Sequence, residues 1–335
     1  MTDIQSAKQV VLDHYAEIAA ATPATIAEAL GRRTHPDWLW RGMHPLHEQT
    51  GAGAVAEAFW GPFLTSMTRV QRRQDVFMAG PNQIDGFRST WVVSMGHLMA
   101  LFDRAFLGIR PTGKIAMLRY AEFNKVEDGQ IVETALFFDL IHLMHQAGLR
   151  PLPPQTGAHL VQPGPATHDG LLFDGQDPAM GEKTLALINR MIGDINDHQQ
   201  YKGPADELAA CWHDDMIWWG PDGIGATYTI PRYIEQHQKP FRAQITDRNF
   251  NGHLCRLAEG NFGGFFGWPN LTLTPTGGYM GLTANGKTTA DMRVVDIYRR
   301  EGDKLAENWI FIDMLHFLNM QGLDVLGRMA SLTPE

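Results

Sequence analysis

The sequence predicts an α+β protein made of two tandem copies of one domain. The stretches ETALFFDLIHLMHQAG (133–148) and ENWIFIDMLHFLNMQG (307–322) repeat one pattern at an offset of 174 residues. Over the 31 residues that begin at Arg119 and Arg293, eight positions are identical without a gap. In each copy, apolar residues at helical spacing come first and strand-like runs follow, and this order is typical of α+β domains.

The domain boundaries follow from the length of the repeat. Upstream the offset becomes 178, where HPDWLWRG (35–42) aligns with HDDMIWWG (213–220). Repeats this long exclude a solenoid, whose period is about 20–50 residues. Residues 151–178 contain six prolines and four glycines, which predicts a linker. We therefore expect one domain at 1–150 and a second at 179–335.

Composition excludes several classes of function. A net charge of −9 does not suit a nucleic-acid partner, which needs a concentrated basic surface. No apolar run reaches about eighteen residues, so we expect no membrane span. The start, MTDIQSAKQVVLDHY, lacks the apolar core of a signal peptide, which predicts a cytoplasmic protein. Cys211 and Cys255 are not spaced as a metal or redox motif, and we interpret both as core thiols.

Each copy should begin with helices. Residues 4–20 and 180–198 carry apolar side chains at helical spacing. A second helical stretch is expected to end in a turn at His-x-Asp, which is 35–37 in the first copy and 213–215 in the second. A short Trp-rich strand then follows in each copy.

Strands should form the second part of each copy. After a helix through Pro62 or Pro240, several runs are rich in aromatic and β-branched residues. The turns at 127–129 and 301–303 predict hairpins. The run GNFGGFFGW (260–268) is not a dinucleotide-binding fingerprint, and its glycines predict a kinked or bulged strand.

The repeated Asp-x-x-His pattern has a structural explanation. Asp139 and Asp313 each stand where a strand gives way to a helix, so their side chains are expected to cap it. Gly148 and Gly322 stand just past the end of that helix, where glycine takes the left-handed conformation. A catalytic carboxylate is the alternative for the two aspartates.

We predict no metal site. His142 and His145 are three residues apart on one helix face, a spacing that metal pairs use. The second copy has Asn319 in place of His145, and no acidic ligand stands beside either histidine.

Two carboxylates inside apolar strands are the better candidates for chemistry. Glu122 in MLRYAEFN and Asp296 in MRVVDIYR occupy equivalent positions. If their face of the sheet lines a cavity, desolvation raises the carboxyl pKa and suits the group to act as a general acid or base. If that face is solvated, both are surface charges.

Aromatic residues predict either an apolar pocket or an aromatic core. The candidates for a pocket are Trp40, His97 and Tyr120 in the first copy and Trp218, Trp268 and Tyr298 in the second. Asn308 or His97 would polarise a substrate oxygen.

These motifs resemble a known family. The signature consists of Gly-Lys, a strand ending in Arg-x-x-acid, a turn before Glu-x-Trp, an Asp that opens the last helix, and a closing Gln-x-Gly. It resembles the SnoaL-like polyketide cyclase family of the nuclear transport factor 2-like (NTF2-like) superfamily, most specifically over residues 112–149 and 285–323. The resemblance implies a cone-shaped α+β barrel in each copy, with a curved antiparallel sheet wrapped by the N-terminal helices around an apolar pocket.

The resemblance also has limits at the catalytic positions. The cyclases of the family use an Asp and a His without a cofactor. The Asp position falls at Leu136 and Ile310 here, and the His position falls at Glu122 and Asp296. Leu136 and Ile310 are therefore expected in the pocket, and cyclase activity does not follow.

The sequence thus predicts a protein that binds a small hydrophobic carbonyl or polyketide-like molecule. If it is an enzyme, its acid/base chemistry would be of the cyclase, isomerase or dehydratase type, with Asp296 and Glu122 as bases and no cofactor. The alternative is a non-catalytic binding protein. Superfamily members commonly pair through their sheets, so one domain would serve as a structural pseudo-dimer partner, and further homo-oligomerisation stays open.

Overall fold

The computed structural model describes residues 3–283 and 287–332, and it divides the chain into two compact units. Unit 1 comprises the chain up to Pro151, Ala166–Gly175 and the segment from Leu323 onward. Unit 2 comprises Leu152–Pro165 and Gln176–Gly322. The expected linker 151–178 is thus shared between the two units. The ends of the expected domains, at 1–2 and 333–335, and residues 285 and 286 of the family signature lie outside the described residues.

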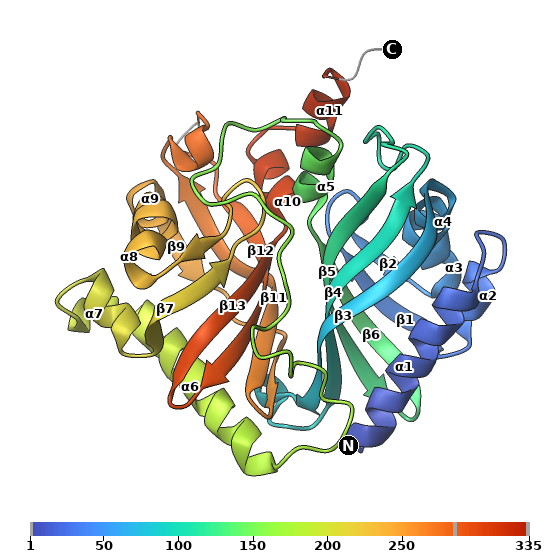
Figure 1. Cartoon of the computed structure of the whole chain (residues 1–335), viewed down its shortest axis with the longest axis horizontal. Coiled ribbons are helices and arrows are strands. Elements are labelled where there is room, and N and C mark those ends of the chain that lie inside the picture. The colour runs from blue at the N-terminus through green and yellow to red at the C-terminus, as the bar shows by residue number, and fades with distance from the viewer. Residues whose placement is uncertain (1–2, 284–286, 333–335) are drawn as a thin grey trace. The chain divides into compact units, whose positions relative to one another are not determined.

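Unit 1 combines one sheet with helices that lie along one side of it between residues 4 and 66, and further helices stand at the end of the strands (Figure 1). Its strands run in the order β2-β1-β6-β5-β4-β3. They are β1 (Thr34–Gly42), β2 (Glu48–Thr50), β3 (Met67–Pro81), β4 (Thr90–Phe102), β5 (Ile115–Glu127) and β6 (Gln130–Phe138). The helical segments are α1 (Ile4–Ala20), α2 (Ile26–Gly31), α3 (Ala52–Val55), the π-helix η1 (Ala56–Trp60), α4 (Gly61–Ser66), the 3-10 turn η2 (Gln83–Asp85), α5 (Leu140–Gln146) and α11 (Val325–Ala330).

Unit 2 repeats this arrangement. Its strands run in the order β10-β11-β12-β13-β7-β8, and β9 also pairs with β11. They are β7 (Trp212–Trp219), β8 (Thr227–Tyr228), β9 (Ile245–Phe250), β10 (Cys255–Glu259), β11 (Phe262–Pro275), β12 (Ala290–Glu301) and β13 (Lys304–Ile312). The helical segments are α6 (Pro178–Asn196), η3 (His198–Gln200), α7 (Pro204–Ala209), α8 (Ile230–Tyr233), the π-helix η4 (Ile234–Gln238), α9 (Lys239–Ala243), η5 (Tyr279–Gly281) and α10 (Met314–Met320).

The long first helix of each unit has a clear start signal. Asp3 caps α1 by accepting from the Ser6 amide, and Asp177 caps α6 by accepting from the Ala179 amide. Pro178 occupies the first turn of α6, where a missing N–H costs nothing. The second long helix therefore begins two residues earlier than expected. In the described part of the chain, no helix has both the length and the hydropathy that crossing a membrane requires.

Each sheet is mixed, which corrects the expectation of a purely antiparallel sheet. β1 pairs with β6 in parallel, and β7 pairs with β13 in parallel, while the other pairs are antiparallel. Parallel neighbours need a crossover connection of about a dozen residues or more. Most of the residues of each unit come between these two strands in the sequence, so the connection is long enough.

Two local expectations differ from the structure in the same way. The stretches 35–37 and 213–215 are not turns but parts of β1 and β7. The preceding helices end earlier, at Gly31 and Ala209. Pairing with the last strand extends β1 and β7 toward their N-terminal ends, as in the pair Thr34 and Ile131.

The hairpins and the irregular strand are confirmed. Asp128 and Gly129 have φ of 48° and 77°, which suits a tight turn between β5 and β6. The pairing of β11 with β12 shifts register between Gly267 and Leu271. At Gly264 an added Cβ would lie 2.4 Å from the Asp296 carbonyl oxygen, so glycine is needed where the two backbones approach closely.

Candidate functional site

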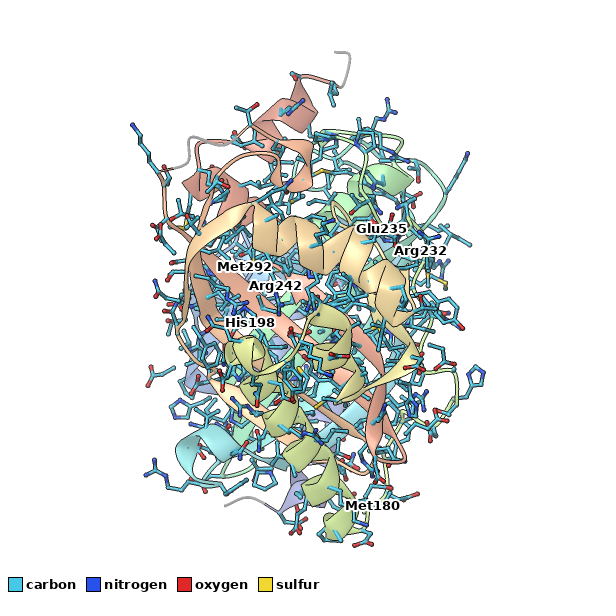
Figure 2. All side chains as sticks on the ribbon, turned by 90° about the vertical axis from the view of Figure 1, so that its left-hand side faces the viewer. Met180, His198, Arg232, Glu235, Arg242 and Met292 are labelled. Carbon is cyan, nitrogen blue, oxygen red and sulfur yellow. The ribbon has the colours of Figure 1, made fainter. Side chains whose placement is uncertain are left out.

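Unit 2 contains a cavity of about 180 Å³. Its walls come from α6, α8, η4, α9 and strands β7, β9, β11, β12 and β13. Figure 2 shows unit 2 from the side of its helices α6, α8 and α9. It labels Arg242 and Met292, which both line the cavity. The lining is mainly apolar with a few polar groups, which is the usual character of a small-molecule site.

Asp296 is the acidic group of this cavity. It lies on β12 and is 7% exposed. Asn308 on the neighbouring strand β13 donates a hydrogen bond from Nδ2 to Asp296 Oδ1 at 2.9 Å, and a second to the Ile297 carbonyl at 3.2 Å. Burial raises the pKa of Asp296 to about 7, against the opposing effect of hydrogen bonds from Asn308 and Tyr298. The carboxyl therefore exchanges its proton near neutral pH, as a general base or acid must.

Tyrosines stand close to this carboxyl. Burial raises the pKa of Tyr298 well above its usual value, and the Asp296 charge raises it further. The pKa of Tyr233 is also raised, first by burial and then by Asp296. Both phenols line the cavity and stay protonated at neutral pH, so each can donate a hydrogen bond.

A stacked aromatic pair forms another wall. The rings of Trp218 and His237 are 4.0 Å apart and 18° from parallel, and Tyr233 meets Trp218 edge-on at 5.6 Å. Burial lowers the pKa of His237 to about 3, so its imidazole is neutral at physiological pH. This wall offers a flat apolar surface on which a planar molecule can stack.

Two arginines also line the cavity. Arg242 donates two hydrogen bonds to the buried carboxylate of Glu207, at 2.9 and 2.7 Å. Arg248 on β9 donates one hydrogen bond to the Ile195 carbonyl at 3.4 Å. Burial and the nearby Arg242 charge both lower the pKa of Arg248.

Of the pocket residues predicted for the second copy, Trp218, Tyr298, Asn308 and Ile310 line this cavity beside Asp296. Trp268 does not, and this prediction is wrong. The Arg293 guanidinium lies 4.0 Å from the centre of the Trp268 ring, and this cation–π contact holds the indole away from the cavity.

At the equivalent positions of unit 1, side chains pack around an ion pair. Arg72 donates to Glu122 at 2.7 Å, and both side chains are largely buried. The Arg72 guanidinium also lies 3.7 Å from the centre of the Tyr15 ring and 4.6 Å from that of Tyr120. Glu122 is therefore a buried ion-pair partner and not an exposed base.

The other pocket residues predicted for the first copy belong to its packed interior. Trp40 stacks on Phe59 at 5.8 Å, and the Tyr120 hydroxyl is 2.8 Å from Ser94 Oγ. His97 Nδ1 lies 3.5 Å from Asp75. Leu136 is 1% exposed.

Strand pairing identifies the residue that replaces Arg72 in unit 2. Leu118 and Met292 are equivalent at the offset of 174. In unit 1, Leu118 pairs with Leu98 on the next strand, and Leu98 pairs with Arg72. In unit 2, Met292 pairs with Leu271, and Leu271 pairs with Phe250. Phe250 therefore stands where unit 1 has its buried cation, and Phe250 lines the cavity.

The two π-helices show a second difference. η1 (Ala56–Trp60) and η4 (Ile234–Gln238) stand 178 residues apart. His237 and Gln238 thus replace Phe59 and Trp60, whose rings pack against each other at 5.0 Å. Polar and smaller side chains at these positions leave room in unit 2 that aromatic rings occupy in unit 1.

The predicted cap residues hold the last helix of each sheet in place. The Asp139 side chain accepts from the His142 amide at 2.9 Å, and that of Asp313 accepts from the His316 amide at 3.2 Å. Gly148 and Gly322 have φ of 74° and 87°. Asp313 is fully buried and also lies 3.2 Å from Arg293, so its carboxylate is used structurally.

Several residues of the site had no signal in the sequence. Tyr233, His237 and Arg242 lie on the short helical segments α8, η4 and α9, which are too short for a periodic apolar pattern to show their inward face. For Arg248 the sequence did contain a signal. The equivalent residue of the first copy is the apolar Val70, so a charged residue at this position of the strand is unexpected.

These features define a class of protein: a tandem α+β chain in which unit 2 holds a cavity with a buried, titrating carboxyl. No protein-family model and no curated protein matches the chain. Among solved structures, it is similar to a protein assigned as a SnoaL-like polyketide cyclase from Jannaschia sp. CCS1. The two are 19% identical over 46% of this chain and 100% of the other, with a TM-score of 0.37.

Two further solved structures are similar to about the same extent. An NTF2-like protein from Burkholderia xenovorans LB400 is 12% identical over 42% of this chain and 97% of its own, with a TM-score of 0.34. An NTF2-like protein from Burkholderia thailandensis E264 is 21% identical over 44% of this chain and 100% of its own, with a TM-score of 0.33. Likeness at these identities and TM-scores carries no information about function.

Proposed function

We propose that unit 2 binds a small, mainly apolar molecule and that Asp296 removes or delivers a proton on it next to a carbonyl group. One observation carries the proposal: a carboxyl with a pKa raised to about 7 lines an apolar cavity. A base in that state is half ionised at neutral pH, and its low-dielectric surroundings raise its reactivity toward a carbon acid.

The neighbouring groups support this role. Asn308 donates to one oxygen of Asp296 and so fixes the carboxyl at the wall of the cavity. Tyr233 is a neutral donor that can hydrogen-bond to an oxygen as negative charge develops there. The ring of Trp218 supplies a stacking surface. After proton abstraction and enolate stabilisation, return of the proton at a second carbon would give an isomerase, and loss of a β-hydroxyl as water would give a dehydratase. Attack of the enolate on a second carbonyl of the same molecule, followed by protonation of the new alkoxide, would give an aldol-type cyclase.

Unit 1 is proposed to be structural. Its carboxyl at the equivalent position, Glu122, is neutralised by Arg72, and Trp60 and Phe59 occupy the positions that are polar in unit 2. This asymmetry makes Glu122 a matched control for Asp296.

The test uses 5-nitrobenzisoxazole, a neutral bicyclic compound that detects a base in an apolar site. The base removes the ring C–H proton, the N–O bond breaks, and a coloured cyanonitrophenolate forms. We expect wild-type protein and Glu122→Gln to accelerate this elimination, and Asp296→Asn to lose the acceleration by about 10²–10⁴-fold, the usual contribution of a general base. Equal rates for wild type and Asp296→Asn would refute the role of Asp296.

The non-catalytic alternative gives a different result. Native mass spectrometry of gently purified protein would then show a retained small molecule in both wild type and Asp296→Asn, with no acceleration of the probe reaction by either.

A further inference from the structure

We propose that the ligand of the unit 2 cavity is a small carboxylic acid in its anionic form and that Arg248 binds its carboxylate. The inference deepens the function proposed above and rests on it for the place of the ligand. It adds the charge of the molecule and the residue that selects it.

While Asp296 is protonated, the charge balance of the cavity leaves one cation over. Arg242 and Glu207 form a doubly hydrogen-bonded pair, and Glu207 is 3% exposed, so this pair is neutral as a whole. Arg248 lines the same cavity, and within residues 3–283 and 287–332 no carboxylate forms an ion pair with it. A guanidinium does not lose its proton in proteins, so the charge of Arg248 persists.

The surroundings of Arg248 disfavour this charge. The side chain is partly buried. Burial and the Arg242 cation lower its pKa, and the Glu207 carboxylate opposes them only in part. Buried charges in proteins are normally paired, because an unpaired one gives up hydration without compensation. An anion in the cavity would supply the missing partner.

The geometry suits a carboxylate. One N–H of the Arg248 guanidinium is used on the Ile195 carbonyl, and its other donors can form the parallel pair of hydrogen bonds that a carboxylate accepts. Phe250 lies two residues further along β9, so it shares the face of Arg248, and it also lines the cavity. A cation beside an aromatic ring suits a ligand that carries a carboxylate next to an apolar group.

Comparison with unit 1 shows that this charge is particular to unit 2. Asp247 and Arg69 have φ of 50° and 56° at equivalent positions, so the two strands correspond residue by residue there. Arg248 replaces Val70, and Phe250 replaces Arg72. In unit 1 the inward cation, Arg72, forms an ion pair with Glu122, whereas within residues 3–283 and 287–332 Arg248 forms no ion pair with Asp296, the equivalent carboxyl.

The charge and the volume of the cavity define the class of ligand more closely. One surplus positive charge matches a monoanion, whereas a phosphate ester with two charges would leave an excess of negative charge beside Asp296. The cavity of about 180 Å³ is slightly larger than an apolar cavity of about 150 Å³ that admits benzene. One ring with a short carboxylate arm therefore fits.

The test measures binding of benzoate, phenylacetate and 3-phenylpropionate, each beside its neutral amide, by calorimetry at pH 6 and low salt, where Asp296 is mostly protonated and the acids are anions. We expect wild-type protein to bind at least one acid about ten- to a hundredfold more tightly than its amide, the range for a hydrogen bond to a charged group. Arg248→Gln should abolish the preference, and Arg232→Gln, an exposed arginine outside the cavity, should keep it. The inference is overturned if no acid is preferred over its amide, or if Arg248→Gln keeps the preference.

The two proposals can fail separately. Elimination of the neutral 5-nitrobenzisoxazole by wild type but not by Asp296→Asn, without any preference for acids, would overturn the anion site alone. A preference for acids that needs Arg248, with no effect of Asp296→Asn on the elimination, would overturn the base alone.

Discussion

Asp296→Asn should stabilise unit 2 in a pH-dependent way. Burial raises the pKa of Asp296 from 3.8 to about 7. Below about pH 4 the group is protonated in both the folded and the unfolded chain and has no effect. Between about pH 4 and pH 7 the unfolded chain releases this proton and the folded chain keeps it, so the free energy of unfolding falls as pH rises. Three pKa units at about 1.4 kcal/mol each give a loss of about 4 kcal/mol above pH 7.

Asparagine has the shape of aspartate and can still accept the hydrogen bond from Asn308, but it does not titrate. The difference in unfolding free energy between variant and wild type should therefore grow by about 3 kcal/mol from pH 5 to pH 8. Hydrogen exchange of the slowest amides of β12 and β13 measures this quantity for unit 2 alone. The exposed Asp214→Asn is the control and should show no such trend. A constant difference across this pH range would refute a raised pKa at Asp296.

Three further predictions concern single contacts. Arg72→Met should destabilise unit 1 by about 3–5 kcal/mol because it leaves the Glu122 carboxylate buried without its cation; the double variant with Glu122→Leu should recover most of the loss in urea denaturation. Asn308→Leu removes a hydrogen bond that lowers the pKa of Asp296, so the pH midpoint of the elimination rate should move above 7, and an unchanged midpoint would contradict this role. Asp139→Ala should cost unit 1 about 1 kcal/mol through loss of the helix cap, and retained thermal stability would show that the cap is dispensable.

Much of the fold could be predicted because its signals are local or repeated. The hairpin at Asp128-Gly129 needs positive φ at two neighbouring residues, and the sequence supplies residues that tolerate it. The duplication was visible as identities at a fixed offset. The parallel pairing of β1 with β6 had no such signal, because it joins strands that are almost 100 residues apart.

The site was predictable only in part, for a physical reason. Glu122 and Asp296 look alike in the sequence, since each is a carboxylate within an apolar strand. Their chemistry is decided by partners from other strands: Arg72 comes from β3, 50 residues away, and Asn308 comes from β13. Strand register selects these partners, and register across a whole sheet cannot be taken from one strand's pattern.

Trp268 illustrates the opposite error. A tryptophan in a glycine-rich strand suggested a pocket wall, but the irregular register of β11 places its ring against Arg293. The bulge itself was expected from the glycines. The direction of the Trp268 side chain after the bulge could not be predicted from the neighbouring residues in the sequence.

The most direct test of the central claim is the pH profile of 5-nitrobenzisoxazole elimination by wild-type protein, measured beside Asp296→Asn and Glu122→Gln. The account predicts a rate that rises with pH through a midpoint near 7, as Asp296 ionises. Glu122→Gln should show the same profile, and Asp296→Asn should show none. A rate that is independent of pH from 5 to 9, or a midpoint near 7 that persists in Asp296→Asn, would contradict the claim that Asp296 is the base of the unit 2 cavity.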